Sequence, residues 1–174
     1  MKQFLVVVDM QKDFVDGALG TEEAVKIVPA VMEKIRNFEG IIFLTYDTHF
    51  DDYLETAEGK KLPIPHCIYG TPGWQLTEPL EELMDEISHY KVQKNTFGST
   101  TLPYLMLEAA DGEDFSIELV GLCTDICVVS NALLLKANFP EAPISVDAAC
   151  CAGVTPALHE AALLTMRSCQ IEVK

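Results

Sequence analysis

The sequence is poor in basic residues. Its 174 residues include 12 lysines and arginines against 27 aspartates and glutamates, which gives a formal net charge of −15. Nucleic-acid phosphates and anionic membranes are also negatively charged and would repel such a chain. We therefore expect neither nucleic acid nor a membrane among its partners.

Long hydrophobic runs are also missing. The first apolar run, residues 4–8, is interrupted by Asp9 and is far shorter than the roughly 18 residues that a membrane span needs. A signal peptide would require a longer apolar stretch and a small-residue cleavage site. The expected location is the cytoplasm.

The cysteines lack the spacing of a structural zinc site. Cys123 and Cys127 are four residues apart and no second pair matches them, whereas a site of four thiolates needs two pairs. Cytoplasmic thiols stay reduced, so each cysteine is expected to be a small buried residue or a reactive thiol. The six are Cys67, Cys123, Cys127, Cys150, Cys151 and Cys169.

Apolar strands alternate with helices along the whole chain. Hydrophobic periodicity predicts strands at 4–9, 41–46, 90–93, 116–120, 144–146 and 170–173, and helices at 22–38, 78–87, 102–110, 124–137 and 156–167. Fully apolar strands that alternate with helices indicate a mostly parallel sheet with helices on both faces. Residues 47–75 are polar and irregular. No repeat or linker divides the chain, so we predict one α/β domain over residues 1–174, a three-layer, doubly wound sheet of six mostly parallel strands.

Ionisable residues follow the carboxyl ends of the predicted strands, where ligands bind in such sheets. Asp9 ends the first strand, Asp47 and His49 follow the second, and Lys94 follows the third. Cys127 lies in the first turn of the helix after the fourth strand. We expect these side chains to converge on one edge of the sheet.

Cys127 is the candidate nucleophile. Thr124 or Asp125 could cap its helix, and free N–H groups at a helix start lower the pKa of a thiol and can hold an oxyanion. Asp9 could accept the thiol proton, with Lys94 as a nearby cation. The alternative is a buried thiol and two solvated charges with no catalytic role.

Asp47, His49 and His66 form a candidate metal set. One carboxylate and two imidazoles suit zinc, iron or manganese and leave positions open for water or substrate. The alternative is a pair of loop histidines that bind no metal.

Three segments, VVVDMQKDF, VQKNTFGS and GLCTDICV, resemble the isochorismatase-like cysteine hydrolase superfamily and, within it, the nicotinamidases. The resemblance covers nearly the whole chain. It implies a catalytic triad of Asp9, Lys94 and Cys127, in which Cys127 attacks an amide carbonyl, Asp9 shuttles the proton, ammonia leaves and water hydrolyses the thioester. It also implies a cis peptide between Leu122 and Cys123, which directs the N–H groups of Cys123 and Cys127 at the oxyanion.

The same resemblance extends to the metal set, through TYDTHF and LPIPHC. It implies that Asp47, His49 and His66 bind a divalent metal, zinc first and iron or manganese as alternatives, which holds the pyridine nitrogen and orients the ring. Some relatives add a carboxylate from the intervening loop. We assign that role to Glu58, with Glu55 as the competitor because the loop length does not fix the alignment.

The resemblance also indicates residues of the substrate pocket. Phe14 is expected to form a wall. Many nicotinamidases have an aromatic residue about three positions before the last metal histidine, but residues 62–65 contain no aromatic ring. Trp74 is therefore our candidate for the stacking surface.

The resemblance implies hydrolysis of nicotinamide to nicotinate and ammonia. The first alternative is another amidase of the superfamily, acting on a carbamoyl or ureido compound. A vinyl-ether-cleaving isochorismatase and a non-catalytic, thiol-sensing binding protein are further alternatives. The expected partner is a small-molecule amide, and a homo-oligomer is expected by analogy with the superfamily.

Overall fold

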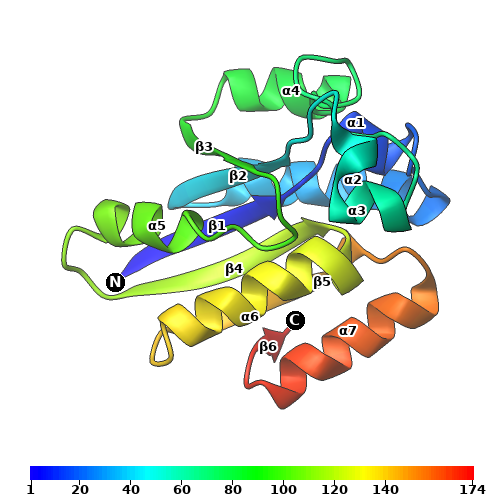
Figure 1. The fold of residues 1–174 in the computed structure, drawn as a ribbon. Coiled ribbons are helices and arrows are strands. Elements are labelled where there is room, and N and C mark those ends of the chain that lie inside the picture. Colours follow the sequence, from blue (N-terminus) through cyan, green and yellow to red (C-terminus); the bar gives the residue numbers. More distant parts are fainter.

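The computed structural model describes residues 1–174 as a six-stranded sheet with helices on both faces (Figure 1). The strands are β1 (Lys2–Val8), β2 (Ile41–Asp47), β3 (His89–Lys94), β4 (Phe115–Leu122), β5 (Ile144–Ala152) and β6 (Glu172–Val173). The helices are α1 (Lys12–Val15), α2 (Glu22–Asn37), the 3₁₀ turn η1 (Tyr53–Glu55), α3 (Ala57–Lys61), α4 (Glu78–Asp85), α5 (Leu102–Ala110), the π-helical turn η2 (Thr124–Val128), α6 (Val129–Asn138) and α7 (Pro156–Ser168). None of these helices is both long and apolar enough to span a bilayer.

The strands lie in the order β3-β2-β1-β4-β5-β6, and every neighbouring pair is parallel. The predicted doubly wound α/β fold is therefore confirmed. The direction of winding reverses between β1 and β4, and ligands of open parallel sheets bind beyond the carboxyl ends of the strands at such a point. Asp9 follows β1 and the η2 turn follows β4, so both flank the reversal.

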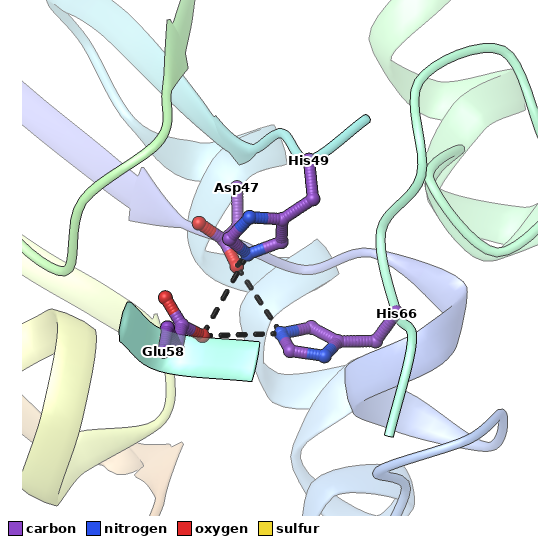
Figure 2. Close-up of side chains that lie close together, drawn as sticks. All are labelled: Asp47, His49, Glu58 and His66. Carbon is purple, nitrogen blue, oxygen red and sulfur yellow. Dashed lines mark hydrogen bonds and ion pairs between the residues drawn. The ribbon is translucent and has the colours of Figure 1, made fainter. Parts of the chain in front are cut away.

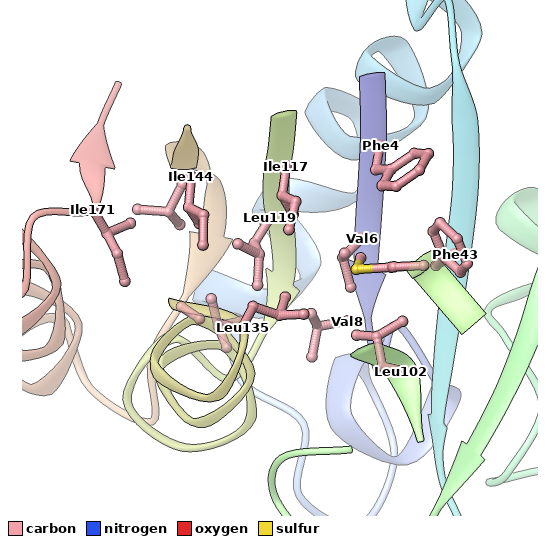
Figure 3. Packing of buried hydrophobic residues seen from close by; sticks show 14 of the residues in the cluster. Phe4, Val6, Val8, Phe43, Leu102, Ile117, Leu119, Leu135, Ile144 and Ile171 are labelled. Atoms are coloured by element: carbon pink, nitrogen blue, oxygen red, sulfur yellow. The ribbon is translucent and has the colours of Figure 1, made fainter. Parts of the chain in front are cut away.

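Each face of the sheet carries its own hydrophobic core. Phe4, Val6 and Val8 of β1 belong to a cluster that includes residues of α5, α6 and α7, part of which Figure 3 shows. Leu5 and Val7 belong to the cluster under α1, α2 and α4. Successive side chains of a strand point to opposite faces. Burial on both faces therefore explains why the strand sequences are continuously apolar.

The structure differs from the predicted elements mainly around polar residues. β5 continues to Ala152, although the sequence predicted its end at Val146, because the polar Asp147 has an ionic partner and can remain in the strand. Residues 47–75, predicted to be irregular, contain η1 and α3. The short α1 was not predicted, and the helix expected from residue 124 opens as a π-helical turn.

Asp147 belongs to an ionic network that joins α2 to the sheet. Lys34 of α2 contacts the carboxylates of Glu118 on β4 and Asp147 on β5, and Lys174 also contacts Glu118 at 2.7 Å. Burial opposes the charge of Lys34, but hydrogen bonds to Asp147 and Glu118 outweigh burial and raise its pKa. Burial alone would raise the pKa of both carboxylates. The contacts with Lys174 and Lys34 lower the pKa of Glu118, and the contact with Lys34 lowers that of Asp147.

This network predicts pH-dependent stability. Carboxylates with a lowered pKa in the folded state stabilise it above their unfolded pKa and lose that contribution as the pH falls. The raised pKa of Lys34 acts at high pH. The contribution of Lys34 to stability is complete below its unfolded pKa and is lost only in strong alkali. Lys34→Met should therefore lower the free energy of unfolding by roughly 1 kcal/mol at neutral pH and by less below about pH 3.

Urea unfolding at the two pH values measures the difference from the wild type. Lys12→Met is the matched control, because Lys12 makes an exposed ion pair with Asp16 that should contribute little. An equal loss for Lys34→Met at both pH values would contradict an ionic role for the network.

Candidate active site

The structure brings the three predicted catalytic side chains together. The ammonium Nζ of Lys94, at the end of β3, lies 2.6 Å from Oδ2 of Asp9 and 3.6 Å from Sγ of Cys127. Asp9 follows β1, and its other oxygen, Oδ1, accepts a 2.6 Å hydrogen bond from the hydroxyl of Thr45 on β2. Asp9, Lys94 and Cys127 are all buried, so little water competes with these contacts. Four separate segments of the chain thus build one ionic site.

The end of β1 approaches β4 very closely beside this site. Gly121 of β4 has φ of +115°, and a Cβ there would collide with the carbonyl oxygen of Val8. The next residue, Asp9, also has a positive φ of +46°, which is uncommon outside glycine. This geometry turns the chain out of β1 at the residue that carries the carboxylate.

Burial dominates the protonation of the nucleophile. It raises the pKa of the Cys127 thiol well above its usual range, and the charge of Asp9 adds to this effect while that of Lys94 opposes it. The predicted lowering of this pKa is therefore wrong for the free protein. Burial opposes the charge on Lys94 too, but Asp9 and Cys127 outweigh it and raise the pKa of Lys94. Burial likewise raises the pKa of Asp9, and the charge of Lys94 opposes this effect.

The η2 turn carries Cys127 with an unusual hydrogen-bond pattern. The Cys123 carbonyl accepts the N–H groups of Ile126 and Val128, both at 3.0 Å, and not that of Cys127. In an α-helix the Cys127 N–H would be the one to bond to this carbonyl. It is therefore released from its helical partner and can serve as a donor to an anion. The peptide bond between Leu122 and Cys123 is cis, as the resemblance implies.

The predicted capping role of Thr124 and Asp125 is wrong. Cys123 occupies the N-cap position, and no side chain caps the turn. Instead, the Thr124 hydroxyl lies 2.8 Å from Nδ1 of His159, and Oδ1 of Asp125 accepts the N–H of Val154 at 2.9 Å. Both side chains point toward the connection from β5 to α7, which leaves the N–H groups at the start of the turn uncapped.

Asn131 is a residue of the site that the sequence did not reveal. One helical turn after the nucleophile, its amide nitrogen donates to the Cys127 carbonyl at 2.8 Å and to the Phe97 carbonyl at 3.2 Å. Its oxygen accepts the N–H of Ser99 at 2.9 Å. This buried amide ties the nucleophile helix to the loop that follows Lys94. A polar residue within the apolar helix, four positions after Cys127, was the available signal.

A second cluster lies next to the triad and contains two imidazoles and two carboxylates (Figure 2). Oδ2 of Asp47 lies 3.0 Å from Nε2 of His49 and 3.6 Å from Nε2 of His66. Oε1 of Glu58, on α3, lies 3.7 and 3.6 Å from the same two nitrogens. Glu55, the competitor, is exposed and outside the cluster. The structure thus places Glu58, and not Glu55, beside the two histidines.

These four donors fit a divalent metal. Ligands at about 2.1 Å from a tetrahedral ion are about 3.4 Å apart, close to the spacings observed. Nδ1 of His66 contacts the Ile64 carbonyl at 2.8 Å, which directs Nε2 toward the cluster. Although burial opposes it, the hydrogen bond with Asp47 raises the pKa of His66, and burial raises that of Glu58. The carboxylate of Asp47 therefore favours positive charge at His66, whereas burial disfavours the negative charge of Glu58.

The VVVDMQKDF segment supports both clusters. The Gln11 side chain donates to the Asp47 carbonyl and accepts the Asp47 N–H, both at 2.8 Å. Oδ2 of Asp13 accepts the N–H of Cys67 at 2.8 Å, in the residue after His66. Alternate residues of one short segment therefore serve both clusters: Asp9 contacts Lys94, Gln11 holds Asp47, and Asp13 holds the residue after His66.

Aromatic rings surround the two histidines. The Phe14 ring centroid lies 5.4 Å from that of His66, so Phe14 borders the metal cluster. Tyr53, which the sequence did not reveal, packs edge-on against His49 at 4.7 Å and against His66 at 5.0 Å. Its hydroxyl donates to the Leu62 carbonyl at 2.9 Å. These rings restrict the rotation of both imidazoles.

Trp74, the candidate stacking surface, has contacts of its own. It belongs to the hydrophobic cluster under α2 and α4, and its ring packs against Tyr46 and Tyr69, with the Lys91 ammonium 4.5 Å from its centroid. The indole N–H donates to the Thr48 hydroxyl at 2.9 Å. These contacts explain its burial without a substrate, and its role in the pocket stays a prediction.

Comparisons of sequence and of structure both find isochorismatase-family proteins similar to this chain. The isochorismatase domain family matches residues 3–173. The isochorismatase family protein PncA of Bacillus subtilis is 33% identical over 147 residues, which cover 76% of this chain and 78% of that protein. The crystal structure of a nicotinamidase/pyrazinamidase PncA from Bacillus subtilis has a TM-score of 0.86 at 26% identity and 99% coverage of both chains. Pyrazinamidase of Pyrococcus horikoshii, in complex with zinc, has a TM-score of 0.80 at 25% identity and covers 100% of this chain and 99% of its own.

The position of Glu58 predicts a loss of metal affinity on neutralisation. Glu58→Gln removes one of two anionic ligands and should weaken zinc binding at least about tenfold. Competition with a chromophoric chelator at pH 7 measures this affinity. Glu55→Gln is the matched control and should bind zinc as the wild type does. Equal affinity in both variants would exclude Glu58 as a ligand.

Proposed function

Because this chain belongs to the isochorismatase family, we propose that it is a nicotinamidase that hydrolyses nicotinamide to nicotinate and ammonia. It is a hydrolase of amide C–N bonds, in accord with its nicotinamidase/pyrazinamidase neighbours. The single observation that carries the proposal is the position of Lys94, whose ammonium contacts Asp9 and Cys127 and also lies 3.4 Å from Asp47 of the four-donor cluster. A single domain, a cytoplasmic location and a homo-oligomeric assembly remain predictions from the sequence.

In the proposed reaction, Asp9 activates the nucleophile. Both the Cys127 thiol and the Asp9 carboxylate contact the ammonium of Lys94, and the thiol would transfer its proton to that carboxylate as Sγ attacks the amide carbonyl carbon. The carbonyl electron pair moves to oxygen, and the N–H groups of Cys127 and Cys123 would donate to this oxyanion. Burial raises the pKa of Asp9, which suits a proton acceptor, and the charge of Lys94 opposes this effect and favours the ionised carboxylate.

Asp9 then acts as the general acid. It returns the proton to the amide nitrogen, the C–N bond breaks and ammonia leaves, so that Cys127 carries a thioester. Asp9 next accepts a proton from water, and the resulting hydroxide equivalent attacks the thioester carbonyl. The C–S bond breaks, the carboxylic acid is released and Cys127 recovers its proton.

The four-donor cluster would orient the substrate. A divalent ion bound there, for which we propose zinc with iron or manganese as alternatives, supplies a Lewis acid that binds a pyridine nitrogen. Asp47 would hold this ion through Oδ2, while its Oδ1 faces Lys94. The shared carboxylate fixes the distance between the ring anchor and the triad. Phe14, beside His66, would form a wall of the ring pocket.

A thiol-sensing role finds no support in the adjacent Cys150 and Cys151. The two side chains lie in the hydrophobic clusters on opposite faces of β5, where they cannot face each other. Burial raises the pKa of Cys150 to about 11 and that of Cys151 further. Neither thiol therefore has the exposed, ionised character of a redox sensor.

The proposed triad predicts the effect of two substitutions on ammonia release from nicotinamide. Cys127→Ala removes the nucleophile and should lower kcat at least about 1,000-fold. Asp9→Asn preserves the size of the side chain but cannot transfer the proton, and should lower kcat about 100-fold or more. Cys169→Ala, at an exposed cysteine, is the control and should keep wild-type turnover. Near-wild-type activity of Asp9→Asn would eliminate Asp9 as the base.

Metal removal separates nicotinamidase from the alternative amidase. If the ion anchors the pyridine nitrogen, the chelated protein should lose about tenfold or more in kcat/KM for nicotinamide, and added zinc should restore it. Turnover of benzamide, which lacks the ring nitrogen, should not change. Unchanged turnover of nicotinamide by metal-free protein would contradict the metal anchor, and no turnover with metal restored would favour a carbamoyl or ureido substrate.

A further inference from the structure

The nucleophile turn is held from behind by residues that the proposed reaction does not use. Thr124, the first residue of η2, is fully buried, and its hydroxyl contacts Nδ1 of His159 on α7 at 2.8 Å. The next residue, Asp125, accepts the N–H of Val154 at 2.9 Å. Two consecutive residues of the turn are thus fastened to the segment formed by the β5–α7 connection and the start of α7.

Gly153 permits this close approach. A Cβ at this position would lie 2.8 Å from the backbone nitrogen of His159 and 2.9 Å from Oδ1 of Asp125. Both distances are shorter than van der Waals contact allows. The absence of a side chain at Gly153 therefore lets the connection reach the turn.

The turn needs such external support. No side chain caps η2, and its π-helical hydrogen bonds leave the Cys127 N–H without its α-helical partner. π-Helical turns are rare and occur mostly as single turns at functional sites. The bonds of the turn itself therefore define the direction of Cys127 less firmly than a capped α-helix would.

We propose that His159 is a positioning residue for the nucleophile. Through Thr124, it holds the η2 turn so that Sγ of Cys127 remains beside Asp9 and Lys94 and its N–H remains directed at the substrate. The catalytic part of this proposal rests on the proposed amide hydrolysis, whereas the restraint of the turn does not.

Substitutions of His159 separate the hydrogen bond from the bulk of the ring. His159→Ala removes the bond and should lower kcat about tenfold, since misplacement of a reacting group slows the reaction more than it weakens binding, with KM within about twofold of the wild type. His159→Asn places an amide where Nδ1 lies and should recover most of kcat. His159→Gln carries its amide farther out, where Nε2 lies, and should not. Thr124→Val should match His159→Ala, and the double variant should show no additional loss.

Hydrogen exchange of the peptide covering residues 123–129 tests the restraint without any substrate. Exchange should accelerate in His159→Ala and Thr124→Val but not in His159→Asn. The control is His89→Ala, since His89 at the start of β3 is also a partly buried histidine, with its Nδ1 2.8 Å from the Ile87 carbonyl. This variant should change neither exchange in the turn nor kcat.

The two measurements distinguish the possible failures. Unchanged exchange in His159→Ala would overturn the restraint itself. Faster exchange with unchanged kcat, or an equal loss of kcat in the Asn and Ala variants, would overturn the positioning role. If the wild type hydrolyses no amide, the proposed function fails, and the exchange experiment still decides whether His159 restrains the turn.

Discussion

The buried ammonium of Lys94 is the interaction on which the rest of the site depends. It contacts the carboxylate of Asp9, the sulfur of Cys127 and, more distantly, the carboxylate of Asp47. An unpaired charge in such an environment is strongly destabilising, and so are two carboxylates without a cation. Each group is thus stable in the interior only because the others are present. The three proposed catalytic residues and the four-donor cluster form one electrostatic unit, joined by the two oxygens of Asp47.

The parallel sheet makes this arrangement possible. β3, β2 and β1 are neighbours. β3 and β2 end with a charged residue, and one directly follows β1, all at the same edge of the sheet. The return of the chain to β4 then brings Cys127 to the other side of β1. Helices on both faces keep water from the strand ends, which strengthens every ionic contact there. Side chains within one short segment, Gln11 and Asp13, then hold the backbone of Asp47 and of Cys67, the residue after His66.

The reactivity of the cysteine follows from position rather than from a lowered pKa. Burial raises the pKa of the Cys127 thiol in the free protein, so in the proposed reaction Asp9 must lie beside it to accept its proton when the substrate carbonyl arrives. This places a strict demand on the direction of the η2 turn. The turn has no cap of its own, and the contacts of Thr124 and Asp125 with the β5–α7 segment supply the missing restraint.

The local hydrophobic pattern of the sequence was sufficient to predict the fold and to identify the polar residues at the strand ends. Hydrophobic period is a property of neighbouring residues, and in a parallel sheet the position of Asp9, Asp47, Lys94 and Cys127 after their strands already places them at one edge. Only the tertiary structure placed Glu58 rather than Glu55 beside the two histidines, directed Thr124 and Asp125 away from the cap, and reversed the expected pKa shift of Cys127. These features depend on burial and on partners supplied by distant segments, and a short stretch of sequence does not contain that information.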